Sequence, residues 1–83
     1  MITKKDAILI AQTFAKAAKF DIENHCHGDS GKIGMVRSVL FRSLDDLYYD
    51  VMSLKVRDQF REESPYNGSG REMFLKYARE IVG

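Results

Sequence analysis

The chain has 83 residues, of which 45% are hydrophobic and 30% charged, and its 13 basic and 12 acidic residues give a formal charge of +1. This composition predicts one small globular domain spanning residues 1–83, without the broad basic surface that grips a nucleic-acid backbone. The single cysteine, Cys26, excludes an intramolecular disulfide and fits a reducing compartment. We therefore expect a cytoplasmic protein, and its small core leaves self-association open.

The N-terminal segment is predicted to be a helix over residues 4–20. Thr3 followed by Asp6 has the spacing of a helix cap. Asp21 would fall on the apolar face, so we expect the helix to end or bend near Phe20. The predicted apolar face comprises Ala7, Ile8, Ile10, Ala11, Phe14, Ala15 and Ala18, and Leu9 points away from it.

Polar residues interrupt every long apolar run. Asp6, Gln12 and Lys16 break up the stretch that would otherwise resemble a signal peptide. No stretch approaches the ~18 apolar residues of a membrane span. We therefore expect neither a secretory leader nor a membrane anchor.

The middle of the chain is less regular. The run NHCHGDSGKIG, residues 24–34, has the composition of a loop. Residues 33–42 fit a helix, with Met35 at the margin of an apolar side formed by Ile33, Val36, Val39 and Leu40. The same segment also fits a strand, because apolar residues alternate at Ile33, Met35, Val39 and Phe41. We favour the helix, because the only strand partner would be the segment after Phe20 and an isolated two-stranded hairpin is marginal.

Residues 44–63 form the longest predicted helix, and the other helices are expected to pack around it. Ser43 and Asp46 have the spacing of a capping box, and Pro65 would stop the helix. Its apolar residues form two stripes that change over near Leu54, which predicts different neighbours for its two halves. The stripes are Leu44, Leu47, Val51 and Leu54, and Tyr49, Met52, Val56 and Phe60, with Tyr48 between them.

The C-terminal segment is predicted to be a helix over residues 70–82. Residues 66–70 read as a turn, and Ser69 with Glu72 gives the clearest capping box of the chain. The short connection predicts antiparallel packing on the second stripe. The predicted fold is therefore all-α, a compact bundle of three or four helices, and the alternative is α+β with a small β-hairpin within residues 20–41.

Two short motifs have a weak chemical meaning. His25, Cys26, His27 and Asp29 are metal-ligand types, but adjacent residues rarely converge on one ion, so we expect no bound metal and leave open whether the cluster has a role. The run GDSGKIG fails the P-loop pattern, because Cys26 replaces its first glycine and Ile33 its hydroxyl residue. A Cys/His nucleophile would need a third orienting group and a pocket. We expect no enzyme activity and no cofactor.

Nucleic-acid binding is kept as an alternative function. Lys32, Arg37 and Arg42 could line one edge of the second helical segment. The acidic residues that follow would repel phosphate. Direct contact with nucleic acid is therefore not expected, although a small nucleic-acid-associated regulator remains the second hypothesis and a homo-oligomeric structural protein the third.

Protein binding is the favoured function. The aromatic residues Tyr48, Tyr49 and Tyr66 are of a type enriched at interfaces, although we expect Tyr48 to lie in the core. The predicted partner-binding residues are Asp45, Asp46, Tyr49 and Asp50. A small adaptor or stoichiometric inhibitor fits this profile, for example a phage-type inhibitor of host machinery such as a CRISPR effector. Its partner would be a protein, and a nucleic-acid-binding protein is one candidate class.

Overall fold

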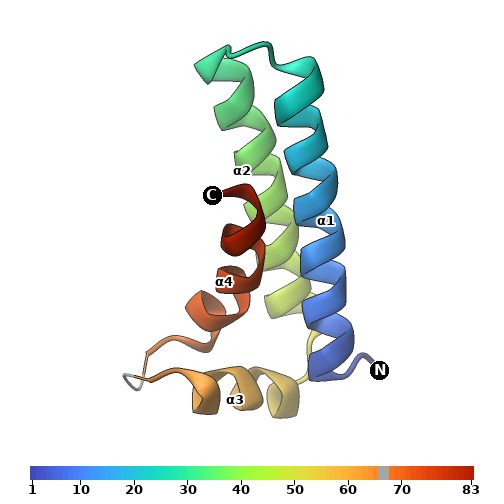
Figure 1. Cartoon of the computed structure of the whole chain (residues 1–83). Helices are drawn as coiled ribbons and strands as arrows, with labels where there is room; N and C mark the ends of the chain where they lie inside the picture. The colour runs from blue at the N-terminus through green and yellow to red at the C-terminus, as the bar shows by residue number, and fades with distance from the viewer. Residues whose placement is uncertain (66–67) are drawn as a thin grey trace.

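The computed structural model describes residues 1–65 and 68–83, and the fold is all-α as predicted. Two long helices, α1 (Lys4–His25) and α2 (Ser30–Asp46), form an antiparallel hairpin. A π-helical segment, η1 (Leu47–Val51), leads to α3 (Leu54–Glu63), which crosses the base of the hairpin (Figure 1). Helix α4 (Gly70–Val82) then returns along the hairpin. The alternative hairpin within residues 20–41 is wrong, because that segment is helical apart from its turn.

Part of the predicted turn over residues 66–70 lies outside the described residues. Tyr66, one of the three aromatics considered for binding, is among the residues left out.

Helix α1 begins as predicted and ends later than predicted. The Thr3 hydroxyl accepts a hydrogen bond from the Asp6 amide, and the Asp6 carboxylate accepts one from the Thr3 amide, at 3.1 and 3.0 Å. These two hydrogen bonds from Thr3 hold the pKa of Asp6 below its ordinary value. The predicted end near Phe20 is wrong: Asp21 is exposed beside His25, so continuing the helix to His25 buries no charge.

Helix α2 is longer than the predicted segment 33–42. It starts at Ser30 because the Asp29 side chain caps it, accepting hydrogen bonds from the amides of Gly31 and Lys32 at 2.9 and 3.2 Å. The predicted capping box at Ser43 is wrong. Ser43 lies inside the helix, and its hydroxyl donates to the Val39 carbonyl oxygen at 2.9 Å. The predicted loop over 24–34 therefore shrinks to the four residues 26–29.

The predicted single helix over residues 44–63 is also wrong. It divides into the end of α2, η1 and α3, with an extended residue at Met52 (ψ 133°) and a new helix cap at Ser53, whose hydroxyl accepts from the Val56 amide at 3.3 Å. The amide of Met52 donates to the Leu47 carbonyl oxygen at 2.9 Å, the five-residue step of a π-turn.

A repeated spacing of four residues explains this break. Every fourth residue from 44 to 60 is buried: Leu44, Tyr48, Met52, Val56 and Phe60. On a straight helix each such step rotates by about 40°, so Phe60 would point roughly 160° away from Leu44. The π-turn winds more residues per turn, and the break at residues 52–53 changes the direction of the chain. Together they let all five side chains enter one core.

The aromatic part of this core joins α3 to α4, which confirms α3 as a neighbour of the C-terminal helix. The predicted antiparallel packing is wrong, because α3 crosses the base of the hairpin whereas α4 runs along it (Figure 1). The ring centroids of Phe60 and Phe74 lie 5.2 Å apart, and those of Tyr48 and Phe74 5.9 Å apart. Tyr48 is buried as expected, with 7% of its surface exposed. Helix α4 also packs against α1, whose buried positions form a stripe of small residues: Ala7, Ala11, Ala15 and Ala18.

A polar cluster ties three helices together near the N-terminus of α1. Glu63 at the end of α3 forms an ion pair with Lys4 of α1 and accepts a hydrogen bond from the Tyr77 hydroxyl of α4. That hydrogen bond, together with burial, raises the pKa of Tyr77 to about 12. Burial pushes the pKa of Glu63 upward, but the hydrogen bonds from Lys4 and Tyr77 outweigh it and bring the pKa below its ordinary value.

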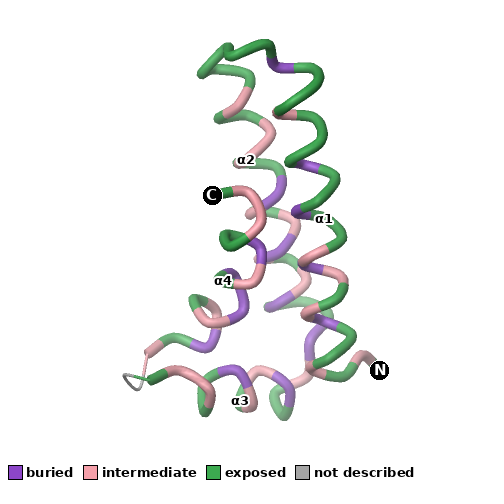
Figure 2. Tube along the Cα trace, in the orientation of Figure 1, coloured by how far each residue is buried: buried purple, intermediate pink, exposed green. Residues whose placement is uncertain are grey.

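Figure 2 shows that burial follows these contacts. Buried positions are concentrated where α1, α2, α3 and α4 meet, whereas the end of the hairpin nearest residues 26–29 is mostly exposed. The carbonyl oxygen of Val82, at the end of α4, accepts a hydrogen bond from Arg37 at 3.3 Å. Helix α4 therefore ends about halfway along α2, on the face of α2 that carries Arg37.

Candidate functional site

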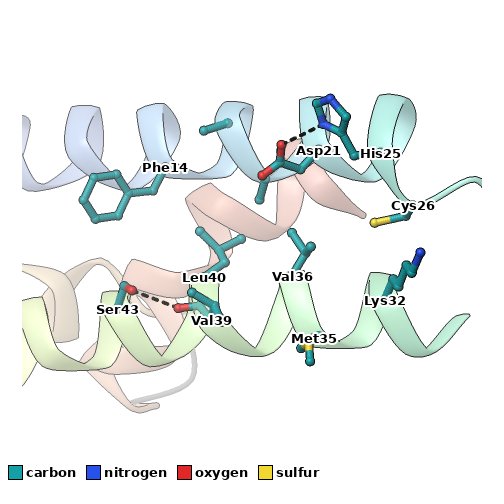
Figure 3. Close-up of a pocket in the computed structure, with 12 residues that line it drawn as sticks. Phe14, Asp21, His25, Cys26, Lys32, Met35, Val36, Val39, Leu40 and Ser43 are labelled. Carbon is teal, nitrogen blue, oxygen red and sulfur yellow. Dashed lines mark hydrogen bonds and ion pairs between the residues drawn. The ribbon is translucent and has the colours of Figure 1, made fainter. Parts of the chain in front are cut away.

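An apolar groove of about 610 Å³ runs between α1 and α2. We call it the hairpin groove. Figure 3 shows Val36 and Leu40 between the two helices, with Phe14 at one end and Cys26 near the other. Its lining residues are Phe14, Ala17, Ala18, Asp21, His25 and Cys26 of α1 and the turn, and Lys32, Met35, Val36, Val39, Leu40 and Ser43 of α2.

The groove lies on the face of α2 that α4 leaves open. Arg37 and Phe41 face α4, since Arg37 bonds to Val82 and the Arg79 guanidinium carbon lies 5.5 Å from the Phe41 ring centroid. Met35 and Val39 each lie two residues before one of these, and a two-residue step turns a helix by about 200°. They therefore point away from α4 and remain 67% and 61% exposed.

On the α1 side, small residues create the hollow and a large one borders it. Ala17 and Ala18 leave space between the helices, whereas the Phe14 ring at the edge is 44% exposed. The sequence placed Phe14 on the core face of α1, but among the described residues nothing packs over it to bury it fully. The groove therefore offers aromatic and aliphatic surface that the chain itself does not cover.

Polar groups border the groove near the hairpin turn. His25 Nδ1 lies 3.2 Å from Asp21 Oδ1, and both side chains are more than half exposed. Lys32 stands across from them on α2. The rest of the lining is mainly apolar, so the groove is suited to covering the apolar side chains of another molecule.

The residues of the His/Cys cluster are placed separately. His25 pairs with Asp21, Cys26 is buried at the end of the groove, and Asp29 caps α2. His27 forms the turn with a positive φ of 48°. Among the described residues, no group of three His, Cys, Asp or Glu side chains is arranged to hold a metal ion.

The predicted partner-binding residues lie where α2 passes into η1, and they point in different directions. Asp45 faces α4, where its two oxygens accept hydrogen bonds from Arg71 Nε and Nη2 at 2.7 and 3.0 Å. This pairing with Asp45 raises the pKa of Arg71 above its ordinary value. Asp46 is exposed and, three residues after Ser43, lies on the groove side of α2.

The two remaining predicted residues, Tyr49 and Asp50, are exposed at the corner between α2 and α3. The Tyr49 ring is 54% exposed and stands edge-on to the buried ring of Tyr48, with centroids 5.1 Å apart. Val51 and Leu54, which the sequence assigned to an apolar stripe, follow one and four residues after Asp50 and are 58% and 69% exposed. We call Tyr49, Asp50, Val51 and Leu54 the corner surface.

The basic residues considered for nucleic-acid binding are also distributed. Arg37 is engaged with Val82 and with the Phe41 ring, whose centroid lies 5.7 Å from the guanidinium carbon. Lys32 borders the groove, and Arg42 is exposed elsewhere on α2. With Arg37 committed to the contact with α4, the three do not form one free basic edge.

The sequence prediction named Tyr49 and Asp50 of the corner surface as partner-binding candidates and included none of the residues that line the groove. A usable signal was present: Met35 lay at the margin of the predicted apolar face, four residues before Val39. That pair marks a second apolar stripe beside Val36, which is partly buried, and Leu40, which is buried.

No protein-family model matches this chain, and no match was found among curated proteins or solved structures. In the described part of the chain, no helix is long and apolar enough to cross a membrane.

Proposed function

We propose that this chain is a small non-enzymatic protein-binding module that acts by occupying a surface of another protein, as an adaptor or a stoichiometric inhibitor. The observation that carries the proposal is the corner surface, where an aromatic and two aliphatic side chains stand more than half exposed next to a carboxylate. Isolated exposed apolar residues are ordinary, but three within six positions, on the segment that contains the π-turn, are typical of a binding surface.

The composition of the corner indicates the chemistry of the partner. Tyr49 offers a rigid amphipathic ring, and Val51 and Leu54 offer aliphatic surface. Asp50 adds a negative charge, and Asp46 lies one helical turn earlier, whereas Asp45 is neutralised by Arg71. A complementary partner surface would combine an apolar patch with Lys or Arg.

A basic groove on a nucleic-acid-binding protein would offer such a surface. CRISPR effectors are host machinery with grooves of this kind, and a phage-type inhibitor would act by occupying the groove. The proposal places the protein in the cytoplasm, supported by its single cysteine, which cannot form an intramolecular disulfide.

The test is an affinity capture from the source cell followed by mass spectrometry, comparing the wild-type chain with the double variant Tyr49→Ala, Asp50→Lys. The matched control is Phe20→Ala, Glu23→Lys on α1, because the Phe20 ring, 59% exposed, resembles Tyr49 in exposure and Glu23 is also exposed. Circular dichroism verifies that both variants remain helical.

We expect one protein to be captured in stoichiometric amount by the wild type and by the control, and its yield to fall at least about tenfold with the corner variant. Equal capture by the corner variant, or no protein enriched by the wild type, would refute the proposal.

A further inference from the structure

We propose that the hairpin groove is filled by a second copy of this chain, packed antiparallel to the first, so that two α1–α2 hairpins form a four-helix bundle. This inference goes beyond the binding function of the corner surface, and none of the side chains that carry it belongs to that surface. It rests on the exposed apolar lining of the groove and on a self-complementary pattern of charge and size along its two helices.

The charge pattern is centred on Val39. Lys32 lies seven residues before Val39 and Asp46 seven residues after it, within the single helix α2. Seven residues are almost two full turns, so all three side chains lie on one face, with each charge about 10.5 Å from Val39. Both charged residues are exposed.

A two-fold axis through Val39 would bring these opposite charges together. In an antiparallel pair of α2 helices related by this axis, Val39 meets Val39 of the other copy. Lys32 of each copy then faces Asp46 of the other, so that two ion pairs flank an apolar centre. A self-complementary patch of this kind is what an isologous dimer requires.

The size pattern on α1 has the same centre. Val39 is nine residues after the start of α2 at Ser30, and the midpoint of Phe14 and Ala17 is nine to ten residues before the end of α1 at His25. Because the helices run antiparallel from one short turn, these positions lie at about the same level. The same axis then places each Phe14 ring over Ala17 of the other copy.

This arrangement gives Phe14 a partner of matching shape. The ring is 44% exposed in the single chain, and Ala17 is one of the small residues that hollow the groove. Packing a large side chain against a small one lets facing helical layers interlock. The second copy would thus supply the cover that α4 supplies on the opposite face of α2.

The available area sets the expected strength. The face is as long as the 17 residues of α2, about 25 Å, and two helices wide, about 20 Å, or roughly 500 Å² in projection. Two copies would bury at least about 1,000 Å², which is at the low end of specific interfaces. We therefore expect a dimer that dissociates on dilution, in the micromolar range.

The first test measures mass against concentration by sedimentation velocity and by size-exclusion chromatography with light scattering, from about 1 to 500 μM. The dimer fraction should rise with concentration. Val39→Arg, which puts two like charges on the axis, should abolish dimerisation. The control Val51→Arg changes a valine of similar exposure, 58% against 61%, outside the groove and should leave the dimer intact.

A charge-swap experiment tests the antiparallel register. Lys32→Asp or Asp46→Lys alone replaces two attractive pairs by two repulsive ones, and each should raise the dissociation constant by about tenfold. Combining both substitutions in one chain should restore the dimer, because each charge again meets its opposite. Mixing the two single variants should yield a heterodimer for the same reason.

A monomer at every concentration would overturn the proposal, as would a dimer that survives Val39→Arg. A dimer that neither single reversal weakens would overturn the register argued here. These results leave the capture experiment at the corner surface unaffected, because neither Tyr49 nor Asp50 contributes to the groove.

Discussion

Gly70 is the position where a single added methyl group should be most informative about the packing of this fold. It is the first residue of α4 and is buried against α3 and η1. A Cβ atom there would lie 2.5 Å from the Tyr48 hydroxyl oxygen, 2.9 Å from the Arg57 carbonyl oxygen and 3.1 Å from the Arg61 amide nitrogen. The variant Gly70→Ala therefore forces α3 and α4 apart.

The magnitude follows from which of these atoms can move. The Tyr48 ring is stacked against Phe74 in the core, and the atoms of Arg57 and Arg61 belong to the backbone of α3. Overpacking of this kind costs about 1–3 kcal/mol, whereas the better helix propensity of alanine returns less than about 1 kcal/mol. We expect a net loss of about 1–2 kcal/mol, which lowers Tm by roughly 4–15 °C in a domain of this size.

Gly34 provides the matched control. It lies inside α2 on the surface, and a Cβ atom there would meet nothing within 4 Å. Gly34→Ala should therefore raise the free energy of unfolding by about 0.5–1 kcal/mol through helix propensity alone. Both variants are compared with the wild type by thermal and urea denaturation followed by circular dichroism at low micromolar concentration. Gly70→Ala as stable as the wild type would refute the close approach of α4 to α3.

Three further predictions concern polar contacts between helices. Tyr77→Phe should lower the free energy of unfolding by about 1 kcal/mol at neutral pH, because it removes the hydrogen bond to Glu63. The pKa of Tyr77 is raised, so this contribution is present below pH 10 and is lost as pH rises to about 12. The difference between variant and wild type should close over the same range. The pKa of Glu63 is lowered, so its contribution to the free energy of unfolding is present above its unfolded pKa of about 4.5 and should be lost as pH falls further. In acid titrations of the denaturation midpoint, this loss should be absent from the Glu63→Gln variant. Asp45→Asn should lower the free energy of unfolding by about 1 kcal/mol, and by less at high salt, because it breaks the ion pair with Arg71. Asp50→Asn should leave urea denaturation unchanged. Equal effects of the two substitutions would contradict a structural role for Asp45.

Local signals in the sequence predicted the starts of α1 and α4. Thr3 and Ser69 each accept the expected backbone hydrogen bond, and helices start beside them. Ser43 misled because a serine inside a helix can bond backward to the carbonyl oxygen four residues earlier, as it does to Val39. Ser53, which caps α3, was not recognised because the apolar pattern of residues 44–63 resembles that of one continuous helix.

The interhelical contacts could not be predicted from local pattern. Asp45 resembled Asp46 and Asp50 in the sequence, and only the folded chain brings Arg71, 26 residues away, against it. The groove was missed for a related reason. Apolar residues such as Phe14 look alike whether a neighbour covers them or not, and the neighbour is decided by the length and direction of α4.

The lengths of the helices explain why one chain leaves its hairpin half covered. The 22 residues of α1 extend about 33 Å, whereas the 13 residues of α4 extend about 20 Å and pack on one face only. The alanine stripe of α1 lets α4 approach closely on that face. The change of chain direction at residues 52–53 places α3 across the base of the hairpin, so α3 does not cover the other face. No described helix is left for the opposite face, where Phe14, Met35 and Val39 stand exposed. A cover for that face must come from outside the described fold, and the symmetric positions of Lys32 and Asp46 about Val39 are what favour a second copy as that cover.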